Sequence, residues 1–223
     1  MGKRGPKPEG KVKITWSSNF AYAIGLIASD GNLSPSGRHI NFTSKDKEQA
    51  ENYLKALSIL CSIGKKANNG GGKRKYFVIQ FGDVLFYRFL QTIGIHPAKS
   101  KTLGKIQISA KYFFDFLRGV FDGDGYSHSY WDKRWKSSFM YYVGFVSASA
   151  EYIRWLQSEL RTRLGVTGHI TKGGAQSTCQ QLKYAKKEGS LILKSMYYSK
   201  KVLCLSRKRL KNEKILAIVG KSL

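Results

Sequence analysis

The chain repeats itself after 94 residues, and this repeat limits its possible folds more than any other feature. Five identical or similar pairs carry the repeat: Ile14 and Ile108, Thr15 and Ser109, Gly25 and Gly119, Asp30 and Asp124, Gly31 and Gly125. A unit that occurs twice at a fixed spacing is typical of a structure built from two copies that pack on each other. The 223 residues therefore predict two related lobes of roughly 110 residues each.

Each copy of the repeat begins with a predicted helix. A hydroxyl residue, Thr15 or Ser109, precedes a run of apolar residues at helical spacing, and an Asp-Gly pair ends it. Ser and Thr cap helix N-termini, and glycine commonly follows the last turn. We therefore predict a helix of about four turns in each copy, capped by Thr15 and Ser109.

Beyond this helix, the pattern of apolar residues alternates as in half-buried strands. Residues 38–45 place Ile40 and Phe42 on one face and polar side chains on the other, and residues 74–81 repeat the pattern. Phe145-Val146-Ser147 matches Phe42-Thr43-Ser44 at an offset of 103, so the hairpin at 126–142 is nine residues longer than its counterpart. The order predicted for each copy is α-β-β-α-β-β-α, which is an α+β fold.

The predicted domain organisation follows from this order. The first lobe spans residues 12–94, a connection follows at 95–108, and the second lobe spans 109–223. Residues 1–11 are rich in Gly, Pro and Lys, a composition that favours a flexible basic arm.

The charge of the chain indicates a polyanionic partner. Its 39 Lys and Arg against 14 Asp and Glu give a net charge of +25, so nucleic acid is the first candidate and an acidic membrane surface the weaker one. No apolar stretch reaches the roughly 20 residues that a membrane span requires, and no secretory signal is evident. We expect a soluble, intracellular protein without a membrane partner.

Asp30 and Asp124 lie in the last turn of their predicted helices, where the negative end of the helix dipole disfavours a carboxylate. A divalent cation would resolve this conflict, because two carboxylates and the free carbonyls near Ser29 and Gly123 are the oxygen ligands that Mg²⁺ prefers. Gly25 and Gly119 each cost a helix roughly 1 kcal/mol relative to Ala. Their presence predicts that the two helices touch there, which would bring both Asp residues together.

AIGLIASDG (residues 23–31) and LRGVFDGDG (residues 117–125) resemble two copies of the LAGLIDADG motif. The chain thus resembles a single-chain LAGLIDADG homing endonuclease over nearly its whole length. The resemblance implies motif helices at a pseudo-twofold interface, antiparallel saddle-shaped sheets over the DNA major grooves, and a catalytic Asp at the eighth motif position. Both eighth positions are Asp here, whereas the chain departs from the motif at Ala23, Ile24, Ala28, Arg118 and Val120.

The resemblance extends to further site residues. Lys99 and Lys208 resemble the basic residue that this family places beside the metal site. Outward strand residues are expected to hydrogen-bond base edges in the major groove. These predicted DNA-binding residues are Arg38, Asn41, Thr43, Lys45, Arg74, Tyr76, Gln80, Gln181 and Lys183.

The function implied is Mg²⁺-dependent hydrolysis of both strands of a long, partly palindromic DNA site by a monomer encoded in an intron. Ca²⁺ is expected to support binding without cleavage. Two alternatives share the same fold: a splicing maturase whose partner is intron RNA, and a non-catalytic DNA-binding protein. Retention of Asp30 and Asp124 favours the nuclease.

Overall fold

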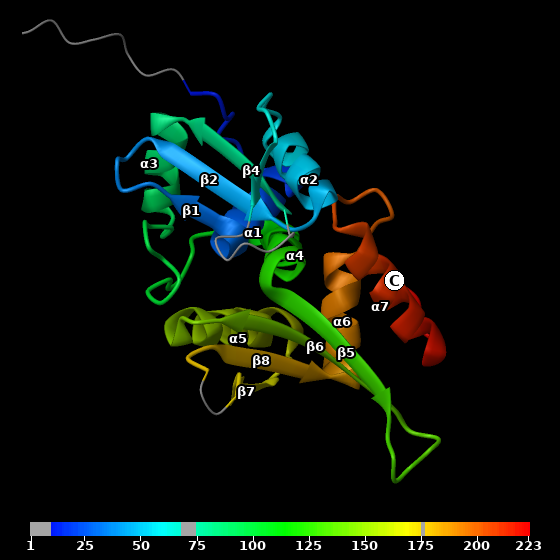
Figure 1. The fold of residues 1–223 in the computed structure, drawn as a ribbon. Coiled ribbons are helices and arrows are strands. Elements are labelled where there is room, and N and C mark those ends of the chain that lie inside the picture. Colours follow the sequence, from blue (N-terminus) through cyan, green and yellow to red (C-terminus); the bar gives the residue numbers. More distant parts are fainter. Residues whose placement is uncertain (1–9, 68–74, 175–176) are drawn as a thin grey trace, which may run out of the picture.

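Two lobes lie on either side of a central pair of helices in the computed structural model, which describes residues 10–67, 75–174 and 177–223 (Figure 1). The central helices are α1 (Ser18–Asp30) and α4 (Phe113–Asp124), one from each copy of the repeat. Their contact is the most extensive between any two elements in these ranges. The repeat thus builds the centre of the molecule as well as its two halves.

Both lobes have the predicted α-β-β-α-β-β-α order. After α1, the first lobe continues with β1 (Gly31–Leu33), β2 (His39–Ser44), α2 (Lys47–Leu57), β3 (Gly64–Ala67), β4 (Lys75–Gly82) and α3 (Val84–Thr92). After α4, the second lobe continues with β5 (Gly125–Trp131), β6 (Phe139–Ser147), α5 (Ala150–Leu164), β7 (His169–Lys172), β8 (Gln180–Ala185) and α6 (Lys186–Met196). A final helix, α7 (Ser206–Ile218), packs against β5.

Each lobe contains one antiparallel four-stranded sheet. The strand orders are β1-β2-β4-β3 and β5-β6-β8-β7, so the two sheets have the same topology. In β2, Ile40 and Phe42 are buried while Thr43 is exposed, which confirms the predicted alternation. Apolar side chains of both sheets face the helices and leave the opposite sheet faces polar.

The sheets pair in corresponding register. Asn41 of β2 pairs with Asn32 and Gln80 in the first lobe. Gly144 of β6 pairs with Tyr126 and Lys183 in the second. The same offset of 103 residues that was found in the sequence relates the central strands β2 and β6. The longer β5–β6 hairpin projects well beyond the rest of its sheet (Figure 1).

The helix caps differ from the prediction. Ser17, two residues after Thr15, caps α1 by accepting a hydrogen bond from the backbone N–H of Phe20 at 3.1 Å. Ser109 precedes a short 3₁₀ helix (Ala110–Tyr112), and its side chain makes no capping hydrogen bond. Both predicted caps were wrong, because two hydroxyl residues (Thr15 and Ser17) precede the first helix and a 3₁₀ turn separates Ser109 from the second, and capping depends on local φ/ψ rather than residue type alone.

A buried arginine ties the chain that follows α6 to the central helices. Arg118 is fully buried, and its guanidinium donates to the carbonyls of Leu203 at 2.8 Å and Met196 at 2.7 Å, and to the Asp115 carboxylate at 2.7 Å. Ile24 occupies the corresponding position in α1. The departure from the motif at Arg118 therefore serves a contact that belongs to the second lobe.

None of the helices in the described part of the chain has the length and apolar character that crossing a membrane requires.

Candidate active site

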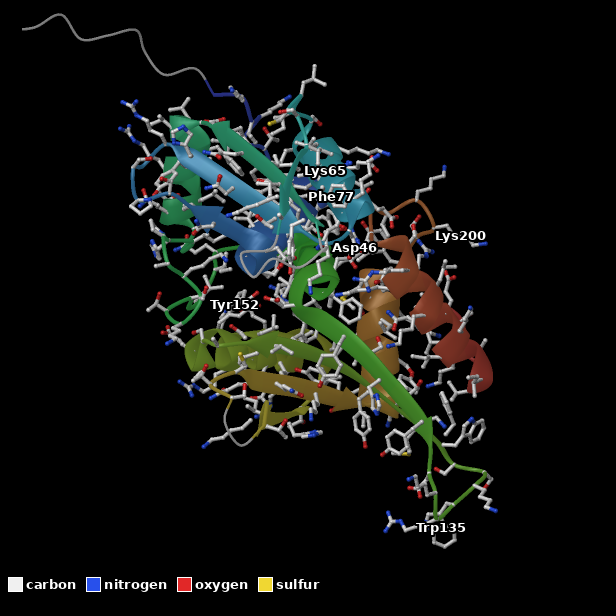
Figure 2. The ribbon with its side chains drawn as sticks, in the orientation of Figure 1. Asp46, Lys65, Phe77, Trp135, Tyr152 and Lys200 are labelled. Atoms are coloured by element: carbon white, nitrogen blue, oxygen red, sulfur yellow. The ribbon has the colours of Figure 1, made fainter. Side chains whose placement is uncertain are left out.

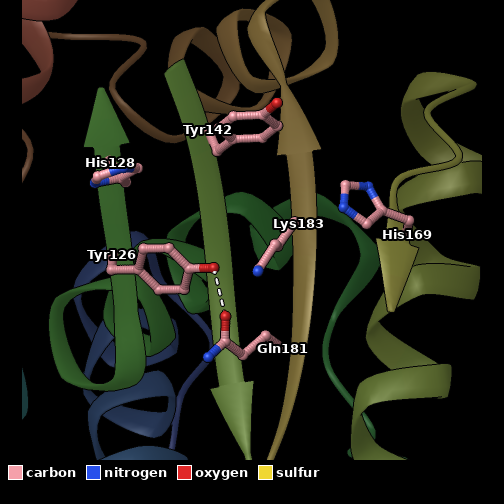
Figure 3. A pocket seen from close by; sticks show the side chains of 6 residues that line it. All are labelled: Tyr126, His128, Tyr142, His169, Gln181 and Lys183. Carbon is pink, nitrogen blue, oxygen red and sulfur yellow. Dashed lines mark hydrogen bonds between the residues drawn. The ribbon is translucent and has the colours of Figure 1, made fainter. Parts of the chain in front are cut away.

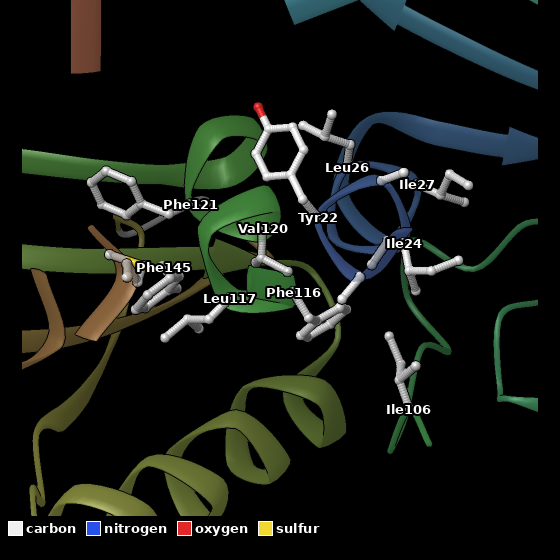
Figure 4. Packing of buried hydrophobic residues seen from close by; sticks show 14 of the residues in the cluster. Tyr22, Ile24, Leu26, Ile27, Ile106, Phe116, Leu117, Val120, Phe121 and Phe145 are labelled. Carbon is white, nitrogen blue, oxygen red and sulfur yellow. The ribbon is translucent and has the colours of Figure 1, made fainter. Parts of the chain in front are cut away.

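The two central helices touch through their glycines, as predicted from the repeat. A methyl group built on Gly25 would lie 2.1 Å from the backbone oxygen of Phe116, and one on Gly119 would lie 2.1 Å from that of Tyr22. Both distances are far below van der Waals contact, so any larger residue would force the backbones apart. Figure 4 shows the apolar side chains that surround this contact, among them Leu26, Leu117 and Val120.

Both helices end at their Asp and turn directly into a strand. Gly31 and Gly125 follow with φ of −83°, so neither is required for a left-handed conformation. The requirement is space: a methyl group on Gly31 would lie 2.7 Å from the Cα of Ile27, and one on Gly125 would lie 2.5 Å from the Cα of Phe121. This tight turn places each carboxylate where helix and strand meet.

The ends of the two helices come together. A methyl group on Gly123 would lie 3.0 Å from the Asp30 carboxylate and would overlap the hydroxyl of Ser29. Burial, followed by the charge of Asp124, raises the pKa of Asp30 to about 6. The pKa of Asp124 is also raised, because the surrounding protein removes part of the water from its carboxylate, although the residue remains exposed at the surface. The site thus holds two carboxylates whose negative charge the protein only partly compensates.

Lys99 and Lys208 are the basic residues of the site. Lys99 is buried and donates to the Ser29 carbonyl at 3.3 Å. Lys208 donates to the carbonyls of Phe121 at 2.6 Å, Gly123 at 3.1 Å and Gly125 at 2.6 Å. Burial lowers the pKa of each lysine to about 8, while the two carboxylates oppose that shift. Each helix end therefore carries one lysine, and both lysines were among the predicted site residues.

Gln49 is a site residue that the sequence analysis missed. It is buried at the start of α2, where its amide donates to the Asp30 carboxylate at 3.2 Å and accepts from the Ser44 hydroxyl at 2.6 Å. The offset of 103 that relates Ser44 to Ser147 places Tyr152 at the corresponding position in the second lobe. Tyr152 is buried near the centre of the molecule (Figure 2), and its hydroxyl has no hydrogen-bond partner among the described residues.

The start of α7 is joined to the first lobe. Arg207 donates to both oxygens of Asp46 at 3.0 and 2.7 Å, and Ser206 donates its backbone N–H to Glu48 at 3.1 Å. Lys208 follows directly, so this contact fixes where its side chain enters the site. A cleft of about 260 Å³ lies here, lined by Asp30, Gln49, Asp122, Arg207 and neighbouring residues.

The donor groups of the site fit a hard divalent cation. Two carboxylates lie near the carbonyls of Ser29 and Gly123, and each carbonyl oxygen keeps a lone pair beyond the one that a lysine uses. Within the described ranges, no three or more His, Cys, Asp or Glu side chains gather as a cation site. A pair of carboxylates completed by water suits Mg²⁺, which is usually held by one or two carboxylates.

Asp115 and Asp122, the other acids of α4, are structural. Asp115 accepts from Arg118 and from the hydroxyls of Ser18 and Tyr198. Asp122 accepts from the Tyr22 hydroxyl at 2.8 Å and from the backbone N–H of Leu205 at 2.7 Å. Both carboxylates are buried in the contact between the lobes, although Asp122 also borders the cleft beside Asp30, and burial raises its pKa to about 6.

The predicted DNA-binding residues that the structure describes lie on or beside the polar faces of the two sheets. In the first lobe, Asn41 and Gln80 are paired, Thr43 follows on the same face, and the Lys45 ammonium lies 5.8 Å from the Tyr76 ring. Arg38 is exposed directly before β2. The other sheet carries Gln181 and Lys183 on β8. Arg74 lies outside the described residues.

Comparisons with known proteins agree with this architecture. The family described as LAGLIDADG-like domain matches the chain twice, over residues 17–94 and 113–212. No curated protein matches the chain.

Three solved structures illustrate the likeness in fold. The homing endonuclease I-WcaI, bound to its DNA recognition sequence, is 15% identical with a TM-score of 0.59, over 89% of this chain and 88% of its own. I-DmoI in complex with DNA and Mn is 14% identical with a TM-score of 0.52, and the match covers 82% of this chain and 97% of I-DmoI. Full-length DUF199/WhiA from Thermatoga maritima is 17% identical with a TM-score of 0.57, over 93% of this chain but only 62% of WhiA.

Proposed function

Because the chain belongs to the LAGLIDADG-like family and carries one motif copy in each lobe, we propose that it is a site-specific endonuclease that cleaves both strands of duplex DNA with a divalent metal ion. The observation that carries the proposal is the pair of carboxylates, Asp30 and Asp124, at the touching ends of α1 and α4. One pair at a pseudo-twofold centre provides one acid for each DNA strand.

The electrostatics of the site support a catalytic rather than a structural role for this pair. A protein gains no stability from a carboxylate whose pKa is raised by burial and by a second carboxylate. Asp115 and Asp122 on the same helix each accept hydrogen bonds from at least two donors on one carboxylate oxygen, whereas Asp30 has the Gln49 amide as its only side-chain hydrogen-bond donor within the described chain. Unrelieved charge of this kind is typical of a site that binds a cation.

A divalent cation at these carboxylates would lower the pKa of a bound water and stabilise charge on the phosphate. Asp30 and Asp124 would supply the ligands, and Gln49 would hold the Asp30 carboxylate in position through its amide. With pKa values of about 8, the Nζ atoms of Lys99 and Lys208 are able to accept and release a proton near neutral pH. I-DmoI, solved with DNA and Mn and, as a variant, with Mg, supports this choice of metal.

The remaining surface supports duplex DNA as the substrate. A net charge of +25 favours a polyanion, and the polar faces of two sheets carry the hydrogen-bonding side chains that read base edges in a major groove. The two faces differ in sequence, so the target is expected to be only partly palindromic. Both motif helices belong to one chain, so we propose that a monomer forms the complete site.

A selection from random DNA tests the proposal. The protein is incubated with a randomised duplex library in Ca²⁺, the bound duplexes are sequenced, and the enriched site is cloned into a supercoiled plasmid. The proposal predicts linearisation of that plasmid in Mg²⁺ and none in EDTA. Enrichment of a duplex without cleavage would indicate that the chain is a non-catalytic DNA-binding protein. Failure to enrich any duplex, together with binding of structured RNA, would favour a maturase.

A further inference from the structure

The polar face of the second sheet contains a pocket of about 480 Å³ that is built differently from the corresponding part of the first sheet. Its lining comes from all four strands, as Figure 3 shows. The lining residues are Tyr126, His128, Tyr142, His169, Gln181 and Lys183. A hollow in the sheet face that is proposed to lie on DNA is large enough to receive the edge of a base pair.

Tyr126 lies across the middle of this pocket. Its ring rests on Gly144, where a methyl group would lie 2.5 Å from the ring carbon that bears the hydroxyl. Because Gly144 has no side chain, the tyrosine of β5 reaches over β6 to Gln181 on β8. Its hydroxyl donates to the Gln181 side-chain carbonyl at 3.0 Å (Figure 3).

This hydrogen bond determines what Gln181 offers to a ligand. A free glutamine amide presents a carbonyl acceptor and an NH₂ donor side by side, and this pair matches the N7 and N6 groups of adenine. Here the carbonyl is directed across the sheet to Tyr126, while the NH₂ group remains available. A phenol is a better donor than acceptor and an amide oxygen a good acceptor, so this orientation of the amide is the favoured one.

Lys183 adds further donors on the same face. It lies two residues after Gln181 on β8, so both side chains point to the same side of the sheet. An ammonium group has three donors and no acceptor. The Gln181 carbonyl keeps a second lone pair but is directed at the Tyr126 hydroxyl, so the groups that Gln181 and Lys183 turn towards a ligand are mainly donors. In the first lobe, the row that corresponds to Tyr126, Gly144 and Lys183 consists of Asn32, Asn41 and Gln80, whose amides offer both donors and acceptors.

We propose that Tyr126 is a positioning residue that restricts Gln181 to donating, so that this pocket selects guanine over adenine in the half of the target bound by the second lobe. The inference rests on the proposed binding of duplex DNA. Guanine presents two acceptors in the major groove, N7 and O6, whereas adenine presents N7 beside the N6 donor. An adenine at this position would direct its amino group at other donors.

The selection from a randomised duplex library in Ca²⁺ provides the test when it is repeated with three variants. Gln181→Ala identifies the base pair, because preference should be lost at the position that Gln181 contacts. The wild-type protein should select guanine there over adenine by roughly 5- to 150-fold, the range for a good base contact. Tyr126→Phe frees the amide and should bring adenine to within about threefold of guanine, while other positions keep their preferences.

Tyr112→Phe is the matched control. It also removes a tyrosine hydroxyl, but from the 3₁₀ helix that precedes α4 and outside the pocket, so the selected sequence should not change. Adenine at the Gln181 position of the wild-type site, or an unchanged preference in Tyr126→Phe, would overturn the inference while leaving the endonuclease proposal intact. If the wild-type protein enriched no duplex at all, the proposed function itself would fail, and the inference with it.

Discussion

Asp30 shows how the site is maintained at a cost to stability. Its pKa is raised to about 6 in the folded protein, whereas an unfolded chain would titrate near the ordinary value of roughly 3.9. The folded state therefore disfavours the charged carboxylate, and this penalty is fully present above pH 6. It fades as the pH falls from about 6 to about 4, because the carboxylate is then protonated in both states.

Asp30→Asn should accordingly stabilise the protein when no metal is bound. We expect the free energy of unfolding in EDTA at pH 7.5 to rise by about 1 to 3 kcal/mol, with the gain disappearing below about pH 4. Urea denaturation at several pH values measures this. Glu51→Gln is the control, since Glu51 forms an exposed ion pair with Lys47 and should change stability by less than about 0.5 kcal/mol. Loss of stability in Asp30→Asn at pH 7.5 would contradict the account.

The sequence was sufficient to predict the placement of the acids and lysines of the site, but not the residues that support them. Asp30 and Asp124 recur at a fixed spacing, and the resemblance pointed to Lys99 and Lys208. Gln49 has no counterpart of its own type, because Tyr152 occupies its position in the second lobe. Contacts that differ between the copies leave no trace in a repeat and become visible only once the lobes are folded.

Among the elements, the pair α1 and α4 was predicted best. Glycine destabilises a helix locally, so the remaining explanation for one glycine in each apolar helix was close approach of the two helix backbones. The contacts of Gly25 and Gly119 confirm this prediction. The order of helices and strands along each lobe was also predicted from the periodicity of the apolar residues. The helix starts were less predictable, since Ser17 and the 3₁₀ turn before α4 depend on backbone angles that the residue pattern leaves open.

Gly119→Ala tests the helix contact. In an ordinary helix this change would stabilise by roughly 1 kcal/mol, but here the added methyl would lie 2.1 Å from the Tyr22 carbonyl. We expect the opposite sign, a loss of at least about 1 to 3 kcal/mol as for other overpacked positions. Thermal denaturation measures it.

Gly64→Ala is the matched control, because Gly64 is exposed in β3 with its nearest neighbour, the Val78 carbonyl, 3.6 Å from the added methyl. It should change stability by less than about 0.5 kcal/mol. A neutral or stabilising Gly119→Ala would show that the two helices are not in contact through their backbones.

At the scale of the whole molecule, the charge of +25 should dominate affinity for DNA. Neutralising 6 to 10 phosphates releases counterions, so affinity is expected to fall by about 10³ to 10⁵ between 50 and 200 mM salt. Fluorescence anisotropy with the selected duplex measures the dependence, and a buffer series at constant pH removes titration effects. A nearly flat response would leave the basic surface without the role proposed for it.

The two lobes share a fold but not a surface, and this asymmetry suits a partly palindromic site. The second lobe has the longer hairpin, the pocket under Tyr126 and the segment held by Arg118. The centre retains the symmetry that the surfaces lack, because an acid and a lysine are present at each helix end.

Plasmid linearisation by the two carboxylate variants tests the central claim most directly. Asp30→Asn and Asp124→Asn should each lower the rate of double-strand cleavage in Mg²⁺ by at least about 100-fold, as expected when a group that stabilises the reacting charge is lost. Binding of the same duplex in Ca²⁺ should stay within about threefold, because the amide has the same shape and removes negative charge near phosphates. Glu51→Gln serves as the control in place of Asp115 or Asp122, whose buried contacts would confuse stability with catalysis. If either variant linearised the plasmid at the wild-type rate, the paired-carboxylate site would not be the site of cleavage.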